Sequence, residues 1–221
     1  MSGSVFPTTE PSRKSKLGRS PGESTQDAVV TLGILGSGSG SNMQAISAAI
    51  ANGALKARIA IVLSDNPDAY ILERARQQGI PAEVIDCDGY LSKFPEVAQA
   101  ETARKLKELQ VDLVCLAGFM RLVKAPLLDE FPSRILNIHP SLLPAFPGIA
   151  AWQQAIRAGV KEAGVTVHLV DSGMDTGEIL LQQAIPVNPN ETPETLHRRL
   201  QLIEHTLYPT AISNHAKTLG L

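Results

Sequence analysis

The stretch of sequence that decides the fold is VVTLGILGSGSGSN, residues 29–42. Its first seven residues, Val29 to Leu35, are almost all apolar, which is typical of a strand buried on both faces of a parallel sheet. A loop of glycine and serine follows from Gly36 to Ser41, and apolar residues then recur at helical spacing from Met43 to Ile50. The order strand, glycine loop, helix predicts the first unit of an α/β fold.

The same alternation of strand and helix continues along the chain. Further strands are expected at residues 58–64, 82–86, 111–117 and 134–138, and further helices at residues 69–78, 96–109 and 126–131. The last part predicts two strands that could pair antiparallel and then a long helix, at residues 165–170, 179–187 and from 192 or 193 towards 216. We therefore expect an α/β, Rossmann-like fold, with helices on both faces of a mostly parallel twisted sheet and an antiparallel edge in its C-terminal half.

Length and composition bound the class of protein. The 221 residues suit one domain, and residues 1–27 are rich in Ser, Pro, Thr, Gly, Lys and Arg, so we expect a disordered N-terminal tail ahead of one domain over residues 28–221. The net charge of −2 and the lack of 18 consecutive apolar residues favour neither nucleic acid nor membrane as a partner. Cys87 and Cys115 have no disulfide or zinc spacing, which fits a cytoplasmic protein.

The glycine loop has three interpretations. Backbone N–H groups of such a loop bind anions together with the N-terminus of the following helix, so the first is a phosphate monoester site. The second is a dinucleotide site of an NAD-dependent oxidoreductase, because Asp65 follows the second expected strand, where such folds carry their ribose-binding acid. The third is a purely structural turn. The loop is no Walker A motif, and Ser41 stands where the last Gly of GxGxxG belongs.

A second polar group lies around the strand expected at residues 134–138. Asn137 and His139 are two residues apart and share one side of a strand, so both could donate hydrogen bonds to an oxygen that gains negative charge. Asp175, in a glycine-bounded turn, could orient or charge the imidazole or relay a proton through water. The plainer interpretation is a packing histidine and an ordinary turn aspartate. His168 is expected to support the cluster by hydrogen bonds, and no metal site is predicted.

Four motifs give the chain a resemblance to a known family. They are GSGSNMQAI at 38–46, LAGFMR at 116–121, LNIHPSLLP at 136–144 and DSGMDTG at 171–177. Over about residues 29–210 the sequence resembles the folate-dependent formyltransferase family. The third motif is shared across that family, and the first and second favour its members that act on glycinamide ribonucleotide.

The resemblance implies direct transfer of the formyl group of 10-formyltetrahydrofolate, as co-substrate, to the amine of glycinamide ribonucleotide in de novo purine (IMP) biosynthesis. Asn137 and His139 would stabilise the oxyanion of a tetrahedral intermediate, and Asp175 would tune His139 and help move the amine proton through water. Residues that would bind the ribonucleotide are Gly40, Ser41, Asn42, Gln201 and Glu204. Residues that would bind the folate are Met120, Arg121, Leu122, Val123, Asn137, Val170, Asp171, Ser172, Gly173 and Met174.

The resemblance also implies a cis bond at Leu143–Pro144, no metal and no NAD. Relatives carry an Arg for the folate tail upstream of Met120, where this chain has Lys93, which could serve as a point charge. Gln201 and Glu204 lie three residues apart and so share one face of a helix. The plainer interpretation of this pair is two exposed polar residues, and the alternative is a contact with the substrate. A 10-formyltetrahydrofolate hydrolase is the nearest rival, although such chains usually carry an N-terminal regulatory domain. We expect a monomer or homodimer.

Overall fold

The computed structural model describes Met1, residues 29–90 and residues 93–221. The tail expected at residues 1–27 therefore lies outside the described residues, except for Met1. Seven strands form one sheet in the order β3-β2-β1-β4-β5-β6-β7. Their bounds are β1 Val30–Leu35, β2 Ala57–Ser64, β3 Ala82–Val84, β4 Leu113–Leu116, β5 Ile135–His139, β6 Glu162–Leu169 and β7 Ile179–Pro186.

Strands β1 to β5 run parallel, and β6 and β7 each pair antiparallel with their neighbour. This confirms the predicted mostly parallel sheet with an antiparallel C-terminal edge. The helices are α1 Ser41–Ala51, α2 Tyr70–Gln77, α3 Glu96–Glu108, α4 Leu127–Glu130, α5 Ala151–Ala158 and α6 Pro193–Thr218.

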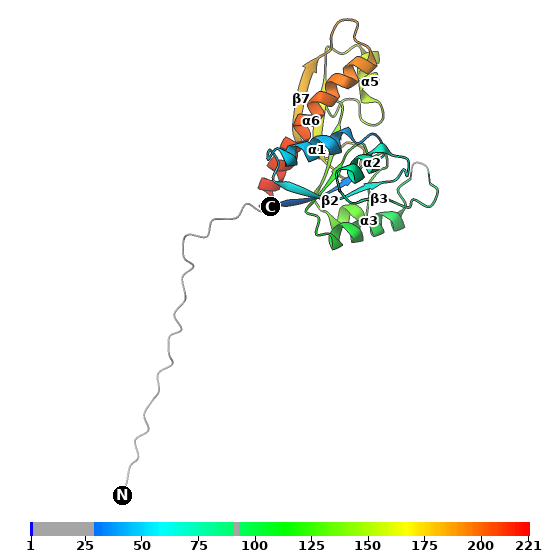
Figure 1. Ribbon diagram of the computed structural model, residues 1–221. Coiled ribbons are helices and arrows are strands. Elements are labelled where there is room, and N and C mark those ends of the chain that lie inside the picture. Colours follow the sequence, from blue (N-terminus) through cyan, green and yellow to red (C-terminus); the bar gives the residue numbers. More distant parts are fainter. Residues whose placement is uncertain (2–28, 91–92) are drawn as a thin grey trace.

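Helices cover both faces of the sheet, because the buried strands alternate their apolar side chains between two cores. In β1, Ile34 packs into a core with residues of α1, α2, α5 and α6, whereas Leu35 packs into a second core with residues of α3 and α4. Strand β4 repeats this alternation with Cys115 and Leu116. Figure 1 shows α3 on one side of β2 and β3, and α1 and α2 on the other.

The structure differs from the sequence-based expectation in one helix and in several element ends. Helix α5 was not predicted: Ala150 precedes it with a left-handed φ of 54° and no side-chain cap, so the usual start signal is missing. Strand β6 begins at Glu162, three residues earlier than expected, since Gly164 interrupts the apolar pattern. A Cβ at Gly164 would lie 2.3 Å from the carbonyl oxygen of Gln183 on β7, which explains the glycine.

The sheet topology fixes where a ligand can bind. From β1 the chain builds outward to β2 and β3 on one side, while β4 and β5 lie on the other side of β1. In such open sheets the crevice for a ligand lies at the carboxyl ends of the strands where the order reverses. The glycine loop after β1 and the segments after β4 and β5 therefore meet at one edge. Within the described residues, no helix is long and apolar enough to cross a membrane.

Candidate active site

A cavity of about 510 Å³ opens at this edge of the sheet. Its walls come from the glycine loop and the start of α1, the segment after β4, the end of β5, the loop after β6, and one face of α6. Of the residues that the resemblance implied for catalysis or binding, all line it except Ser172 and Lys93, the candidate for the folate tail. Residues more than 150 positions apart in the chain are thus brought to one place.

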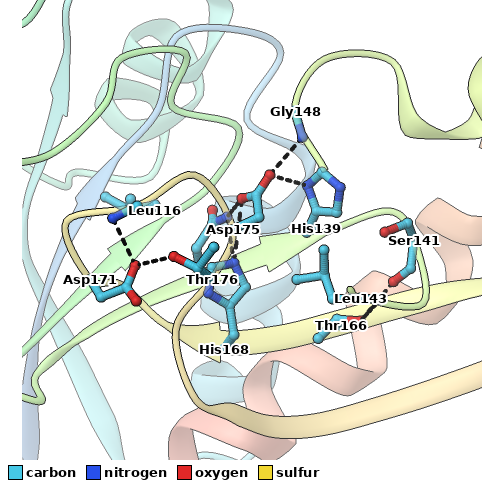
Figure 2. A network of polar contacts seen from close by, with 12 residues as sticks. Leu116, His139, Ser141, Leu143, Gly148, Thr166, His168, Asp171, Asp175 and Thr176 are labelled. Atoms are coloured by element: carbon cyan, nitrogen blue, oxygen red, sulfur yellow. Dashed lines mark hydrogen bonds and ion pairs between the residues drawn. The ribbon is translucent and has the colours of Figure 1, made fainter. Parts of the chain in front are cut away.

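Asp175 is the centre of a polar cluster at one end of the cavity. Figure 2 shows its carboxylate between the rings of His139 and His168, and the N–H of Gly148 donates to its Oδ2 over 2.8 Å. The amide Nδ2 of Asn137 donates to Asp175 Oδ1 over 3.3 Å. The same carboxylate lies 3.4 Å from Nδ1 of His139 and 3.5 Å from Nε2 of His168.

His168 makes the contacts of the supporting histidine that the sequence predicts. Its Nδ1 lies 2.7 Å from the carbonyl oxygen of Leu169, which can only accept, so Nδ1 carries a proton. Its Nε2 lies 3.1 Å from Nδ2 of Asn137. Both ring nitrogens are therefore engaged inside the cluster, where they fix the amide and the carboxylate. In the described part of the chain no three His, Cys, Asp or Glu side chains converge as metal ligands.

The ring of His139 faces an acceptor on each side. Nε2 lies 2.9 Å from the carbonyl oxygen of Phe146, and Nδ1 faces the carboxylate of Asp175. Each ring nitrogen therefore faces an oxygen that can accept a hydrogen bond from it when that nitrogen carries a proton. With a side chain 7% exposed, His139 is also protected from bulk water.

The environment of Asp175 keeps its carboxyl group ionised. Burial by itself raises the pKa of Asp175, but hydrogen bonds from His168 and Gly148 and the charges of the two imidazoles together lower it below the usual 3.8. The turn that carries it is held by Asp171, whose Oδ1 accepts from the N–H of Gly173 and from the hydroxyl of Thr176 over 2.7 Å. Asp175 is thus a fixed negative charge on an ordered turn.

The opposite end of the cavity combines backbone N–H groups with one buried carboxylate. Gly40 precedes α1 with a φ of 77°, and a Cβ there would lie 2.8 Å from the Cα of Ile71, so only glycine fits. Asn42 Nδ2 donates to Glu204 Oε2 over 2.7 Å, while Asn42 Oδ1 is buried without a partner among the described residues. Burial raises the pKa of Glu204, which this one amide only partly offsets.

Apolar side chains line the third wall of the cavity. Met120 and Met174 are 66% and 57% exposed although they are large and apolar, and Val123 is buried behind them. Sequence reasoning missed two further lining residues: Ile149, 84% exposed just ahead of α5, and Trp152, which lies on that unpredicted helix. Trp152 stacks on His197 of α6 with ring centroids 3.8 Å apart.

The position of Asp65 argues against the dinucleotide interpretation of the glycine loop. Ser37 Oγ donates to Asp65 Oδ1 and Arg121 Nε donates to Asp65 Oδ2, each over 2.5 Å. Both carboxylate oxygens are engaged, and the side chain is 8% exposed, so Asp65 is not free to bind ribose hydroxyls. The side chain of Lys93 lies over the ring of Tyr90 and is not among the residues that line the cavity.

The peptide bond at Leu143–Pro144 is cis, as the resemblance implied, and Ala125–Pro126 is a second cis bond that was not expected. The loop between β5 and α5 is further held by Thr166 of β6. Its hydroxyl accepts from the N–H of Leu143 and donates to the carbonyl oxygen of Ser141 over 2.7 Å. Gln182 of β7 donates to the carbonyl oxygen of Leu143. The antiparallel edge therefore anchors the loop that follows His139.

The fold and the cavity define an α/β protein in which a glycine-rich loop and a cluster of polar side chains around Asp175 line one cavity at the carboxyl ends of the strands. The formyl transferase family matches residues 31–212, and the chain belongs to this family. The phosphoribosylglycinamide formyltransferase of Bacillus subtilis is 43% identical over 188 residues, 85% of this chain and 94% of that protein. A crystal structure of glycinamide ribonucleotide transformylase 1 from Symbiobacterium toebii is 50% identical with a TM-score of 0.84, covering 90% of this chain and 94% of that one.

A further relative is much longer than this chain. The trifunctional purine biosynthetic protein adenosine-3 of Drosophila melanogaster is 45% identical over 182 residues, 81% of this chain. The match spans only 13% of the length of that relative.

Proposed function

We propose that the protein transfers the formyl group of 10-formyltetrahydrofolate to the amine of glycinamide ribonucleotide. The observation that carries the proposal is that Asn137, His139 and Asp175 converge at one end of a cavity whose other end is the anion-binding loop before α1. In this transfer the amine nitrogen bonds to the formyl carbon, the bond from that carbon to the folate nitrogen breaks, and the amine proton moves to the departing nitrogen.

The polar cluster fits the charge changes of such a transfer. Negative charge develops on the formyl oxygen when the amine attacks, and the Asn137 amide and the His139 ring, both in the cavity lining, can turn a hydrogen bond towards it. Asp175 orients the ring, because its carboxylate stays ionised and lies 3.4 Å from Nδ1 of His139. The same carboxylate can accept the proton that the amine must lose, directly or through water.

The other end of the cavity fits a sugar phosphate. The loop at Gly40 and Ser41 and the N-terminus of α1 offer N–H donors to an anion. Beside them the buried carboxylate of Glu204 has a single donor, and the Oδ1 of Asn42 has none among the described residues. Acceptors left without donors suit ligand hydroxyls, which a ribose supplies. Gln201 lies on the same wall, one turn before Glu204.

The apolar wall fits the folate. A pteridine and its benzoyl group are flat and mainly apolar, and Met120, Leu122, Val123 and Met174 offer matching surface. Arg121, Val170, Asp171 and Gly173 complete this wall, whereas Ser172 does not face the cavity. A cytoplasmic location and a monomeric or homodimeric state stay predictions, the first supported by the free, buried thiols of Cys87 and Cys115.

The test is an assay of tetrahydrofolate release from 10-formyltetrahydrofolate, with and without glycinamide ribonucleotide. Release that depends on the ribonucleotide would support the transferase. Release without it would instead support a hydrolase that uses water as acceptor. No release under either condition would contradict the proposal. His139→Ala, run in parallel, shows whether any release observed depends on the cluster.

A further inference from the structure

Three polar side chains outside the catalytic cluster form one network behind the apolar wall. Asp65 accepts from the hydroxyl of Ser37 with one carboxylate oxygen and from Nε of Arg121 with the other. The side chains of Arg121 and Asp65 are 6% and 8% exposed, so this is a buried ion pair. The catalytic cluster does not use this ion pair. Among the described residues, the hydrogen-bond partners of the Ser37, Asp65 and Arg121 side chains are main-chain groups or other members of the network.

The network holds main chain from four places in the fold. Ser37 accepts the N–H of Met120 at its hydroxyl over 2.9 Å and donates its own N–H to the carbonyl oxygen of Gly118. Arg121 Nη1 donates to the carbonyl oxygens of Tyr90, over 2.7 Å, and Lys93. The glycine loop, the end of β2, the segment after β3 and the wall after β4 are therefore tied together at one point.

We propose that Ser37, Asp65 and Arg121 are positioning residues that set this wall against the glycine loop, and that Arg121 acts through Asp65 rather than as a contact for the folate tail. The inference deepens the proposed function and rests on it. Turning the Arg121 guanidinium towards a ligand carboxylate would leave Asp65 buried without its cation, which is strongly unfavourable. Two of the three guanidinium nitrogens, Nε and Nη1, already donate to Asp65 and to main-chain carbonyl oxygens.

The two roles of Arg121 predict different substrate dependence. The glutamate of the folate tail carries two carboxylates, and 10-formyltetrahydropteroate lacks that glutamate. A positioning residue shapes the wall for both formyl donors, whereas a contact for the tail matters only for the donor that has a tail. The ratio of the two losses in kcat/KM therefore separates the roles.

The experiment measures kcat and KM of Arg121→Met with both formyl donors. We expect kcat/KM to fall by the same factor with each donor, roughly tenfold, since a charge-assisted hydrogen bond is lost. The fall should lie mainly in the KM for the donor, while the KM for glycinamide ribonucleotide stays close to that of the wild type. A variant that was only partly folded would instead lose kcat and leave both KM values unchanged.

Further variants cover the case in which Arg121→Met fails to fold because it leaves the buried charge of Asp65 unpaired. Asp65→Asn with Arg121→Met leaves no buried charge unpaired in the network, and Ser37→Ala keeps the ion pair but removes the hydroxyl that holds Met120. Both should show the same equal loss with the two donors. Arg104→Met, at an exposed ion pair on α3, is the matched control and should behave as the wild type.

Two results would overturn the inference. One is a loss in the Arg121 variants that appears only with the glutamate-bearing donor, which would make Arg121 a tail contact. The other is an unchanged kcat/KM in folded variants, which would make the network irrelevant to the wall. A wild-type protein without turnover of 10-formyltetrahydrofolate would overturn the proposed function, and this inference with it.

Discussion

Each end of the cavity holds a carboxylate, and the surroundings of the two carboxylates shift their pKa values in opposite directions. The side chain of Asp175 is 13% exposed and is surrounded by an N–H, an amide and two imidazoles. Glu204, 6% exposed as a residue, has only the amide of Asn42. Burial penalises the charge of both, yet the pKa of Asp175 is lowered and that of Glu204 is raised. The donors around Asp175 outweigh the effect of burial on its pKa, whereas the single amide beside Glu204 does not.

This difference matches the task that each end has in the proposed reaction. Asp175, ionised before the reaction, can orient His139 and accept a proton during it. Glu204 is short of donors and would gain stabilisation from the hydroxyl groups of a ligand. The same residue chemistry thus supplies an acid–base centre at one end and a recognition site at the other.

The largest expected effect comes from removing the charge at the first end. Asp175→Asn keeps the size of the side chain but removes the negative charge that faces His139, so we expect turnover to fall by about 10²–10⁴-fold. His139→Ala should have a comparable effect. Steady-state release of tetrahydrofolate measures both, and Asp129→Asn, an exposed aspartate on α4, serves as the control. Near-normal turnover of a folded Asp175→Asn protein would show that the reaction does not need the charge of Asp175.

The second end depends on backbone shape, so a glycine is its most sensitive point. Gly40→Ala combines a φ of 77° with a Cβ that would lie 2.8 Å from the Cα of Ile71, and we expect a loss of about 2–4 kcal/mol of unfolding free energy. Gly53→Ala is a matched control, since its φ is 79° and no atom lies within 4 Å of the added Cβ. It should lose only about 1 kcal/mol. Equal losses in urea unfolding would show that the contact with Ile71 does not matter.

Stability of Asp175→Asn against pH tests whether this end stabilises the ionised carboxylate. A lowered native pKa means that ionised Asp175 contributes stability above the usual 3.8, and that this contribution is lost as pH falls through the native pKa. The variant should therefore be less stable than the wild type at neutral pH, by about 1–3 kcal/mol. Its deficit should shrink below pH 3.8. A deficit that is constant with pH would argue that lost packing, not lost charge, is responsible.

Glu204→Gln should give the smallest effect, with the opposite sign. A raised native pKa means that the folded protein is penalised as pH rises from the usual 4.5 through the native pKa, while below 4.5 the carboxyl is protonated in both states. The variant keeps an acceptor for Asn42 without this penalty. Thermal unfolding should show a gain in stability at neutral pH that disappears in acid. A loss of stability at neutral pH would mean that the Glu204 charge has a donor besides Asn42.

Much of the fold follows from local patterns in the sequence. The apolar run from Val30 to Leu35 and the glycine loop after it predict β1, the turn and α1, because strand burial and helix initiation depend on neighbouring residues. Helix α5 escaped prediction because the residue before it, Ala150, is left-handed with a φ of 54°, a conformation that an alanine in the sequence does not indicate. The residues that it carries into the cavity, such as Trp152, escaped with it.

The candidate site likewise contains one pairing that the sequence could predict and others that it could not. Asn137 and His139 could be paired from sequence, because the two-residue period of a strand is a local property. The sequence could not show that Asn42 would meet Glu204, 162 positions later, or that Arg121 would bind Asp65. These pairings arise only when the sheet brings its carboxyl ends together.

The sequence by itself determined the alternation of strands and helices, the place of the glycine loop between β1 and α1, and the residue types at the site. The tertiary structure decided which of these polar groups are buried, which partners they have, and so which carry charge. The physical reason is that strand and helix patterns depend on neighbours in the chain, whereas desolvation and hydrogen bonding depend on neighbours in space. Asp175 and Glu204 are both acidic residues in the sequence, and the fold alone makes one a fixed charge and the other an acceptor short of donors.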